Sequence, residues 1–297
     1  MPPTPIIYPS SDSDNARWLD FKHRPGDIII STRSKSGTTW MQMICALLVF
    51  QTPDLPSPLW QLSPWLDWLI TPLDEVEAHL AAQTHRRFIK THTPLNGLPL
   101  HPNVTYIVVA RHPLDAAVSF YHHIDNLDRE RLRELTGQTG EPAPTAPRPE
   151  LAEWIHRWIT WEGTANQELD SLPGFMMHLS DAWRRRDEPN VVLVHFDDLI
   201  GDLEGEMRRL AGHLGIEVPG EVWSELVDAA TFQQMRARAD EVAPATGGII
   251  VDNQQFFRKG APGARHEDVK PADVELYLER AHQLAPADML EWLHQGG

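Results

Sequence analysis

The stretch Ile28-Ile29-Ile30-Ser31-Thr32-Arg33-Ser34-Lys35-Ser36-Gly37-Thr38-Thr39-Trp40 decides the fold of this chain. Residues 28–32 are almost entirely apolar or small and predict a buried strand. Residues 33–37 are polar and predict a turn, after which a helix is expected from Thr38 to about Phe50. A turn between a strand and a helix directs backbone N–H groups and the positive end of the helix dipole at one point. The stretch therefore predicts an anion site, and the alternative is an ordinary helix N-cap beside an exposed lysine.

The residue types in this turn suit a phosphate group. Gly37 allows close approach of the backbone to an anion, Thr38 and Thr39 add hydroxyl donors, and Lys35 adds a cation. The order differs from the Walker A loop, in which the lysine directly follows the second glycine. Here the lysine precedes the glycine, so it lies within the turn rather than on the first turn of the helix.

Strands and helices alternate along the rest of the chain. Apolar runs predict strands at residues 87–90, 104–109 and 191–196, and helical stretches are expected at residues 113–125, 150–168 and 203–214. Strands that are apolar throughout and alternate with helices favour a parallel sheet covered on both faces. We therefore expect an α/β fold, with one domain over residues 1–297 around a central, mostly parallel sheet. Residues 136–149 and 240–255 are expected to be mobile loops.

The composition narrows the functional classes. Of the 297 residues, 41% are hydrophobic and 23% are charged, so a packed core is expected rather than disorder. The formal net charge of −16 argues against a general binder of nucleic acids or anionic membranes. We expect no transmembrane segment, because no apolar run approaches the roughly 20 residues that span a bilayer, and no secretory signal. Cys45 is the one cysteine, which excludes a disulfide framework and suits a reducing, cytoplasmic location.

A second anion site is predicted where the strand at residues 104–109 ends. Arg111 follows that strand, and Ser119 lies eight residues later in the next expected helix. An arginine at the carboxyl end of a strand in an open α/β sheet is well placed to bind phosphate through its planar guanidinium group. The alternative is a local ion pair between Arg111 and Asp115.

Two further segments carry candidate residues. Arg258, Lys259 and Gly260 form a basic segment that is either a phosphate-binding loop or a solvated turn. His92 follows Lys90 at the end of an expected strand and precedes a proline turn. The usual pKa of histidine, near 6.5, suits a general base at neutral pH, although the chain has 15 histidines and position alone is weak evidence for any of them.

These segments together resemble the cytosolic sulfotransferase family. Residues 35–40 match the end of its sulfonucleotide-binding loop, Tyr-Pro-Lys-Ser-Gly-Thr-Thr-Trp, residue for residue. The spacing of Arg111 and Ser119 is similar to the family's 3′-phosphate motif, residues 258–260 to its Arg-Lys-Gly, and residues 90–92 to its Lys-Thr-His. Shorter similarities surround two aromatic residues that would flank the nucleobase, Phe196 and Phe232. The matches extend from residue 28 to residue 260 and cover most of the chain.

The resemblance implies a bacterial-like member with the family's P-loop-kinase-like fold and with 3′-phosphoadenosine 5′-phosphosulfate (PAPS) as co-substrate, without a metal. The implied reaction moves a sulfuryl group to a hydroxyl of a small hydrophobic, lipid or glycolipid acceptor by in-line displacement. His92 would be the general base, and Lys35 and Lys90 would stabilise the charge on the bridging oxygen. The residues implied to bind the nucleotide are Lys35, Ser36, Gly37, Thr38, Thr39, Trp40, Arg111, Ser119, Phe196, Phe232, Arg258, Lys259 and Gly260.

Some features depart from the family or leave alternatives open. The family's Asp-Trp after Gly263 is absent, and the tail lacks the Thr-Val pair of a family dimerisation segment, so the oligomeric state stays open. Tryptophans in two segments are either core residues or walls of an acceptor pocket: Trp60, Trp65, Trp68, Trp154, Trp158 and Trp161. The competing functions are a Mg-ATP-dependent kinase, with residues 191–198 as a Walker B analogue, and an inactive nucleotide-binding protein.

Overall fold

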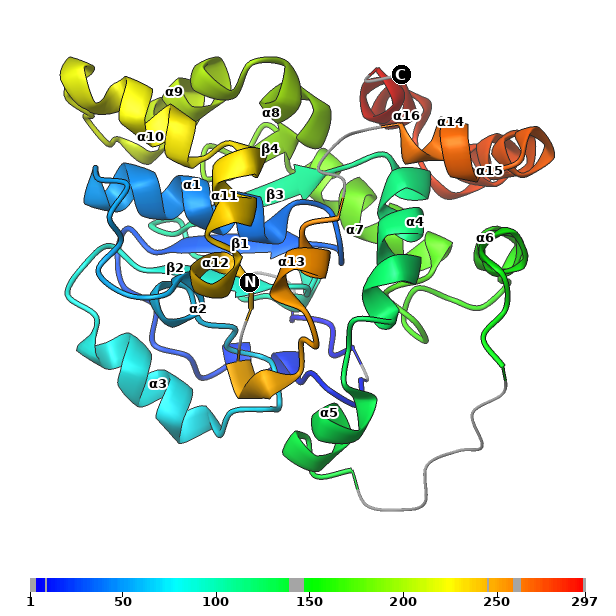
Figure 1. Ribbon diagram of the computed structural model, residues 1–297, viewed down its shortest axis with the longest axis horizontal. Helices are drawn as coiled ribbons and strands as arrows, with labels where there is room; N and C mark the ends of the chain where they lie inside the picture. The colour runs from blue at the N-terminus through cyan, green and yellow to red at the C-terminus, as the bar shows by residue number, and fades with distance from the viewer. Residues whose placement is uncertain (1–3, 9, 139–146, 245, 259–262, 296–297) are drawn as a thin grey trace.

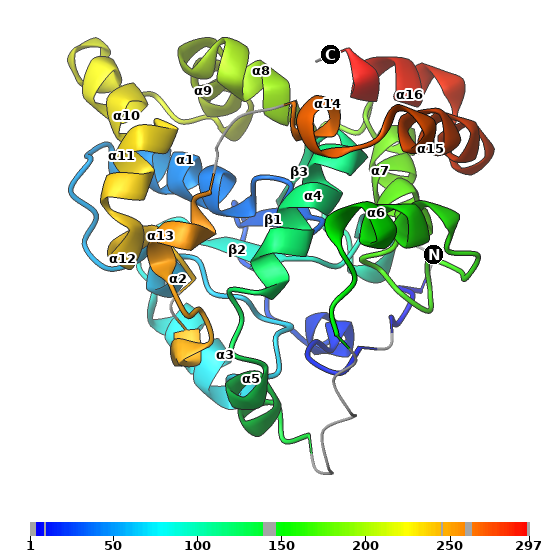
Figure 2. The ribbon, with the colours of Figure 1, turned by 45° about the vertical axis from the view of Figure 1, so that its right-hand side comes forward.

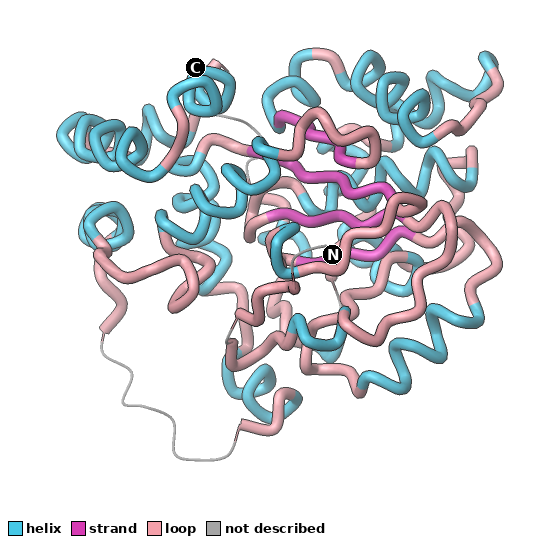
Figure 3. The backbone as a smooth tube through the Cα atoms, turned by 180° about the vertical axis from the view of Figure 1, so that it is seen from behind, coloured by secondary structure: helices cyan, strands magenta, loops and turns pink. Residues whose placement is uncertain are grey.

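A four-stranded sheet forms the centre of the computed structural model, which describes residues 4–8, 10–138, 147–244, 246–258 and 263–295 (Figure 1). All three pairs of neighbouring strands are parallel, in the order β2-β1-β3-β4. The strands are β1 (Ile28–Thr32), β2 (Phe88–Thr91), β3 (Thr105–Ala110) and β4 (Val191–His195). Figure 3 shows them side by side from behind, surrounded by helices. The α/β class and the parallel sheet are as the sequence predicts.

Helices separate β1 from β2 and β3 from β4, as expected of parallel βαβ units, whereas only a short 3-10 helix (Leu95–Gly97) lies between β2 and β3. The α-helices are α1 (Thr38–Phe50), α2 (Leu59–Leu62), α3 (Leu73–Ala82), α4 (Pro113–Ile124), α5 (Arg129–Leu135), α6 (Leu151–Thr160), α7 (Leu172–Arg184), α8 (Phe196–Gly201), α9 (Leu203–Leu214), α10 (Trp223–Ala229), α11 (Phe232–Ala237), α12 (Ala239–Val242), α13 (Asn253–Phe256), α14 (Ala264–Asp268), α15 (Pro271–Leu284) and α16 (Ala287–His294). Figure 2 shows α4 and α6 side by side on one flank of the sheet. Among the described residues, no helix is long and apolar enough to cross a membrane.

Two hydrophobic cores lie on opposite faces of the sheet. Side chains alternate between the faces along each strand, so Ile29 packs in one core with residues of α4, α6, α7 and α15. Its neighbours Ile28 and Ile30 pack in the other core, with residues of α1, α9 and α10. Every residue of β1 is buried. Burial on both faces is the physical reason for the unbroken apolar run in the sequence.

Several predicted elements are confirmed and two are corrected. Strand 28–32 and helices 38–50 and 203–214 have the predicted bounds. The single helix predicted over residues 150–168 is wrong, because α6 ends at Thr160 and Trp161 adopts an extended conformation (φ −60°, ψ 123°). Residues 240–255 are not one loop, since they contain most of α12 and α13. The predicted loop at residues 136–149 falls largely on residues 139–146, outside the described residues.

The segment after Gly263, where the sequence departs from the family pattern, packs against α4. Gly263 has a positive φ of 96° and precedes α14. Its N–H and the N–H of Arg265 donate to the Asp115 carboxylate at 3.1 and 2.7 Å. The Arg265 guanidinium adds an ion pair to the same carboxylate at 2.6 Å. This buried pair holds the segment in place where the family has Asp-Trp.

Candidate functional site

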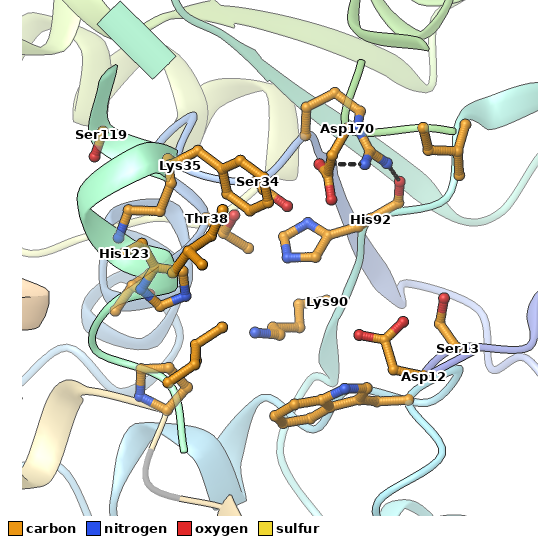
Figure 4. Close-up of a pocket in the computed structure, with 18 of the residues that line it drawn as sticks. Asp12, Ser13, Ser34, Lys35, Thr38, Lys90, His92, Ser119, His123 and Asp170 are labelled. Carbon is orange, nitrogen blue, oxygen red and sulfur yellow. Dashed lines mark hydrogen bonds and ion pairs between the residues drawn. The ribbon is translucent and has the colours of Figure 1, made fainter. Parts of the chain in front are cut away.

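A cavity of about 890 Å³ lies at the carboxyl ends of β1, β2 and β3 (Figure 4). This is the edge of an open parallel sheet at which ligands bind in α/β folds. The predicted site residues that line it are Lys35, Gly37, Thr38, Thr39, Trp40, Lys90, His92, Arg111, Ser119, Phe196, Phe232 and Arg258. Ser36 is buried and is not among the lining residues. Lys259 and Gly260 lie outside the described residues.

The turn between β1 and α1 is held in a conformation that suits an anion. Gly37 has a φ of 100°, and a Cβ atom there would lie 3.0 Å from Phe196 Cδ2. Lys35 also has a positive φ, 63°. The Thr32 and Thr38 hydroxyls lie 2.5 Å apart and close the turn. Ser36 Oγ is buried and has no hydrogen-bond partner among the described residues, so the turn holds an unused hydroxyl close to its N–H groups.

Lys35 lies among other cations. Its Nζ atom is 4.1 Å from the centroid of the Phe256 ring. Burial and, in decreasing order of importance, the charges of Arg111, Lys90 and Arg258 together lower the Lys35 pKa to about 7. Grouped cations repel one another, and an anion placed between them removes the repulsion. The electrostatics of the turn therefore favour a ligand with several negative charges.

Arg111 is tied to the same turn. Its Nη1 donates to the Lys35 carbonyl at 3.0 Å, and its guanidinium carbon lies 4.4 Å from the centroid of the Phe196 ring. Asp115, the partner that the sequence offered as an alternative, forms an ion pair with Arg265. Arg111 thus joins the end of β3 to the turn at residues 33–37, which we call the anion loop. Phe196 packs against both Arg111 and this loop.

The ring of His92 is oriented by the end of β1. Its Nδ1 lies 2.7 Å from the Thr32 carbonyl oxygen. A carbonyl only accepts, so Nδ1 carries the proton and Nε2 of the neutral ring has a free lone pair. Burial lowers the His92 pKa, and the charges of Lys90 and Arg33 lower it further. The side chain is therefore a neutral base at physiological pH.

Two charged residues that the sequence analysis did not select support His92. Arg33 donates one N–H to the His92 carbonyl and another to Asp170 at 2.6 Å. Both Arg33 and Asp170 line the cavity. Asp170 lies between α6 and α7. It is 137 positions from Arg33 in the sequence, so no local pattern connects the two residues.

Lys90 lines the cavity beside Trp65. It is 7% exposed, and its Nζ lies 4.3 Å from the centroid of the Trp65 ring. Burial lowers its pKa to about 8, partly offset by the charge of Asp67. The Asp67 carboxylate accepts from the hydroxyls of Thr91 and Thr93 at 2.6 and 2.7 Å. These bonds fix the strand end that carries Lys90 and His92.

The aromatic residues divide between the cavity and its surroundings. The tryptophans that line it are Trp40, Trp65, Trp68, Trp154, Trp158 and Trp161. Trp60 lines a smaller neighbouring hollow instead. Trp40 donates its indole N–H to the Ala230 carbonyl at 2.8 Å and meets Phe196 edge to face. The two predicted alternatives are not exclusive, because Trp68 and Trp158 are buried in hydrophobic clusters and also line the cavity. Trp65 and Trp154 pack against those clusters and line the cavity too.

His123 is a cavity residue that the sequence analysis missed. It lies on the last turn of α4, with its ring 5.6 Å from that of Phe256. Its position four residues after Ser119 was the available signal, since residues four apart share one face of a helix. Among the described residues, no group of three or more His, Cys, Asp and Glu side chains is arranged to hold a metal ion.

Comparison with known proteins identifies the family. The profile described as "Sulfotransferase domain" matches residues 25–293. The chain belongs to the sulfotransferase family. It is 42% identical to a glycolipid sulfotransferase of Mycobacterium tuberculosis, over 98% of this chain and 94% of that protein. It is 25% identical to human sulfotransferase 2B1, over 88% of this chain and 66% of that protein.

Solved sulfotransferase-like structures share the fold. A mouse sulfotransferase in complex with PAP superposes with a TM-score of 0.69 at 19% identity, over 94% of this chain and 90% of that one. A retinol dehydratase in complex with androsterone and PAP superposes with a TM-score of 0.65 at 21% identity, over 91% of this chain and 83% of that one. The sulfotransferase fold expected from the sequence is confirmed.

Proposed function

We propose that this sulfotransferase moves the sulfuryl group of PAPS to a hydroxyl of a lipid or glycolipid acceptor. The observation that carries the proposal is the hydrogen bond from His92 Nδ1 to the Thr32 carbonyl at 2.7 Å. Thr32 is the last residue of β1, directly before the anion loop. The peptide group of Thr32 therefore connects the anion loop, which suits the donor, with His92, which suits the acceptor hydroxyl.

The residues of the anion loop fit the donor. The unused Ser36 hydroxyl, the close-approach glycine at position 37 and the crowded Lys35 ammonium suit the 5′-phosphate. Arg111, Ser119 and Arg258 line the same cavity and suit the second phosphate, on the 3′ position. We include Lys259 and Gly260 in this second group on the sequence resemblance alone.

PAPS supplies an SO₃ group that is transferred to the acceptor oxygen when the S–O bond to its phosphate breaks. The chain's own residues handle the proton and the charge. His92 Nε2 takes the proton from the acceptor hydroxyl as that oxygen bonds to sulfur. Lys35 and Lys90 stabilise the negative charge that collects on the phosphate side, in a site where burial strengthens electrostatic interactions. We assign no metal to this reaction.

The walls of the cavity and the relatives support the acceptor class. The glycolipid sulfotransferases of two mycobacterial species are each 42% identical to this chain. The cavity extends away from the anion loop between apolar side chains that include Phe120, Ile124, Leu127, Leu132, Ile249 and Ile250. Such a wall suits an acyl or alkyl chain. We propose no nucleic-acid partner, and we leave the oligomeric state open.

We also propose that residues 1–297 act as one domain in the cytoplasm. Both hydrophobic cores share one sheet, which supports a single folding unit. The lone Cys45 is buried and its pKa is raised by burial to about 12, so its thiol is unreactive. Fractionation of expressing cells tests the location, and a membrane-bound or secreted pool would contradict it.

Thermal shift with four ligands tests the donor. We expect stabilisation by PAP without metal, a smaller effect of 5′-AMP, and little effect of ATP with or without Mg²⁺. Transfer of ³⁵S from labelled PAPS to alkyl glycosides in the presence of EDTA then tests the reaction. Stabilisation by Mg-ATP alone would overturn the proposal in favour of a kinase. Strong PAP binding with no transfer to any acceptor would favour an inactive nucleotide-binding protein.

A further inference from the structure

The cavity wall around His92 carries hydrogen-bonding atoms that the protein itself does not use. His123 Nδ1 is buried and has no hydrogen-bond partner among the described residues. Asp12 Oδ1 accepts from the Ser10 hydroxyl at 2.6 Å, whereas Oδ2 has no donor within the described part of the chain. Buried polar atoms in folded proteins are nearly always hydrogen-bonded, so the unused His123 Nδ1 points to a ligand. Asp12 is half-exposed and lines the same cavity, where its second oxygen is available to that ligand.

His123 is placed by aromatic packing rather than by hydrogen bonds. Its ring meets Phe256 edge to face at 5.6 Å, and the same Phe256 ring lies 4.1 Å from Lys35 Nζ. Figure 4 shows His123 beside Lys35 and Thr38, across the cavity from His92. Burial and the charges of Lys35 and Lys90 lower the His123 pKa to about 2, so the ring is neutral. A neutral imidazole offers one donor and one acceptor, as a hydroxyl group does.

Asp12 lies on the other side of the reaction centre. Its carbonyl accepts from the Leu69 N–H at 2.8 Å, and Ser13 forms an antiparallel bridge with Trp68. These backbone contacts fix the N-terminal segment against the loop between α2 and α3. In Figure 4, Asp12 and Ser13 lie near Lys90, on the side away from His123. The two unused groups therefore flank the position where His92 and Lys90 converge.

A single hydroxyl uses only part of this arrangement. The proposed transfer needs His92 and the two lysines at the reacting oxygen, which leaves His123 and Asp12 without a role in the chemistry. A sugar ring presents hydroxyls on both sides of the reacting one. Carboxylates and neutral imidazoles are good partners for such groups. Apolar pocket walls, by contrast, discriminate poorly between alcohols that differ by a hydroxyl.

We propose that His123 and Asp12 bind the hydroxyls that flank the attacked one, and so select a sugar headgroup over a lone alcohol. This inference rests on the proposed sulfotransferase reaction and assigns its acceptor specificity. His123 and Asp12 are specificity residues here, because neither takes the transferred proton nor touches the transferred group.

Two acceptors with the same tail test the assignment. Octyl β-glucoside, below its micelle concentration, and octanol differ only in the sugar. His123→Phe keeps the aromatic packing and removes both ring nitrogens, and Asp12→Asn keeps the shape and removes the charge. We expect each variant to lower kcat/KM for octyl glucoside by roughly tenfold or more, with octanol changed by less than about twofold. His123→Asn, which restores one donor and one acceptor, recovers part of the loss.

His122→Phe is the matched control, since His122 precedes His123 on α4 and is not among the cavity-lining residues. Equal losses for both acceptors, or no loss for either, would overturn the assignment. Calorimetric binding of the same two acceptors, with and without PAP, reads the selectivity even if no turnover occurs. If the wild type does not bind PAP, the proposed reaction is contradicted. If His123→Phe and Asp12→Asn bind octyl glucoside as the wild type does, only the specificity assignment is contradicted.

Discussion

At the scale of single residues, the tautomer of His92 is the central feature. The Thr32 carbonyl fixes the proton on Nδ1, and burial, with the charges of Lys90 and Arg33, lowers the His92 pKa so that the ring is neutral. A positioned base of this kind contributes roughly a hundredfold to ten-thousandfold to a reaction rate. The geometry therefore assigns to one imidazole both a fixed orientation and the protonation state that proton abstraction needs.

His92→Ala tests that role. We expect kcat to fall by about a hundredfold or more, because the variant loses the imidazole that follows β2 and whose Nε2 is the proposed base. PAP binding stays near the wild-type value, since His92 is not part of the anion loop. Steady-state kinetics and PAP titration measure the two quantities. A variant with unchanged kcat would remove His92 from the mechanism.

The lowered pKa of Lys35 predicts that the protein takes up a proton when PAP binds. Without ligand its pKa is about 7, so at higher pH the ammonium loses its proton. A bound phosphate stabilises the charged form and raises the pKa, so binding above pH ~7 takes up a proton and PAP affinity falls as pH rises. Lys90, with a pKa of about 8, adds a second contribution.

Calorimetry in buffers of different ionisation enthalpy measures this uptake. Lys35→Met is expected to remove most of it, and Lys90→Met to remove less. Affinity that is flat from neutral to alkaline pH in the wild type would show that Lys35 stays charged without a ligand.

Residues joined by tertiary contacts were the least predictable part of the site. Lys35, Lys90 and His92 lie in short local patterns, so the sequence suffices to select them. The link from Arg33 to Asp170 crosses 137 positions and depends on how α6 and α7 pack. Asp12 reaches the cavity only because its backbone bonds to the loop at Leu69. No periodicity reports such contacts.

At the scale of elements, the turn between β1 and α1 is the most constrained. Gly37 has a φ that residues with a side chain rarely adopt, and a Cβ atom at this position would contact the Phe196 ring too closely. The same turn was the clearest element in the sequence, because its strand, glycine and helix are contiguous. The end of α6 was harder to predict, since an amphipathic pattern of tryptophans continues past Thr160 while the backbone does not.

Gly37→Ala is expected to lower the free energy of unfolding by about 1–2 kcal/mol through the left-handed backbone alone. The contact with Phe196 displaces the ring or the loop, so PAP affinity falls as well. Chemical denaturation and PAP titration measure the two effects. Gly215→Ala is a useful control, because it also has a positive φ but meets no atom within 4 Å. Equal PAP affinities for both variants would contradict a role of residue 37 in the loop.

At the scale of the whole molecule, one sheet carries two cores. Ile29 and Ile30 are adjacent in sequence, fully buried, and lie in different cores. Side chains of β1 alternate between the two cores, so the strand is held in place by both. We therefore expect the two cores to unfold together. The edge of the sheet that carries the cavity lies where elements from both cores meet, so the geometry of the cavity depends on both cores.

We therefore expect Ile29→Ala and Ile30→Ala to destabilise the protein in one shared unfolding transition. Each is expected to lower the free energy of unfolding by about 2–5 kcal/mol, and circular dichroism and tryptophan fluorescence should report the same urea midpoint in each variant. Two separate transitions, each sensitive to one substitution, would divide the chain into independent units.

The hydrogen bond between His92 and Thr32 also offers a signal for spectroscopy. An imidazole N–H held 2.7 Å from a carbonyl oxygen exchanges with water more slowly than one without a partner. Its proton resonance should therefore be visible by NMR, far downfield of the amide region. Because the acceptor is the last peptide of β1, the position and exchange rate of this one resonance report whether the neighbouring loop is open or filled. The protein thus carries its own probe of donor occupancy, without any label.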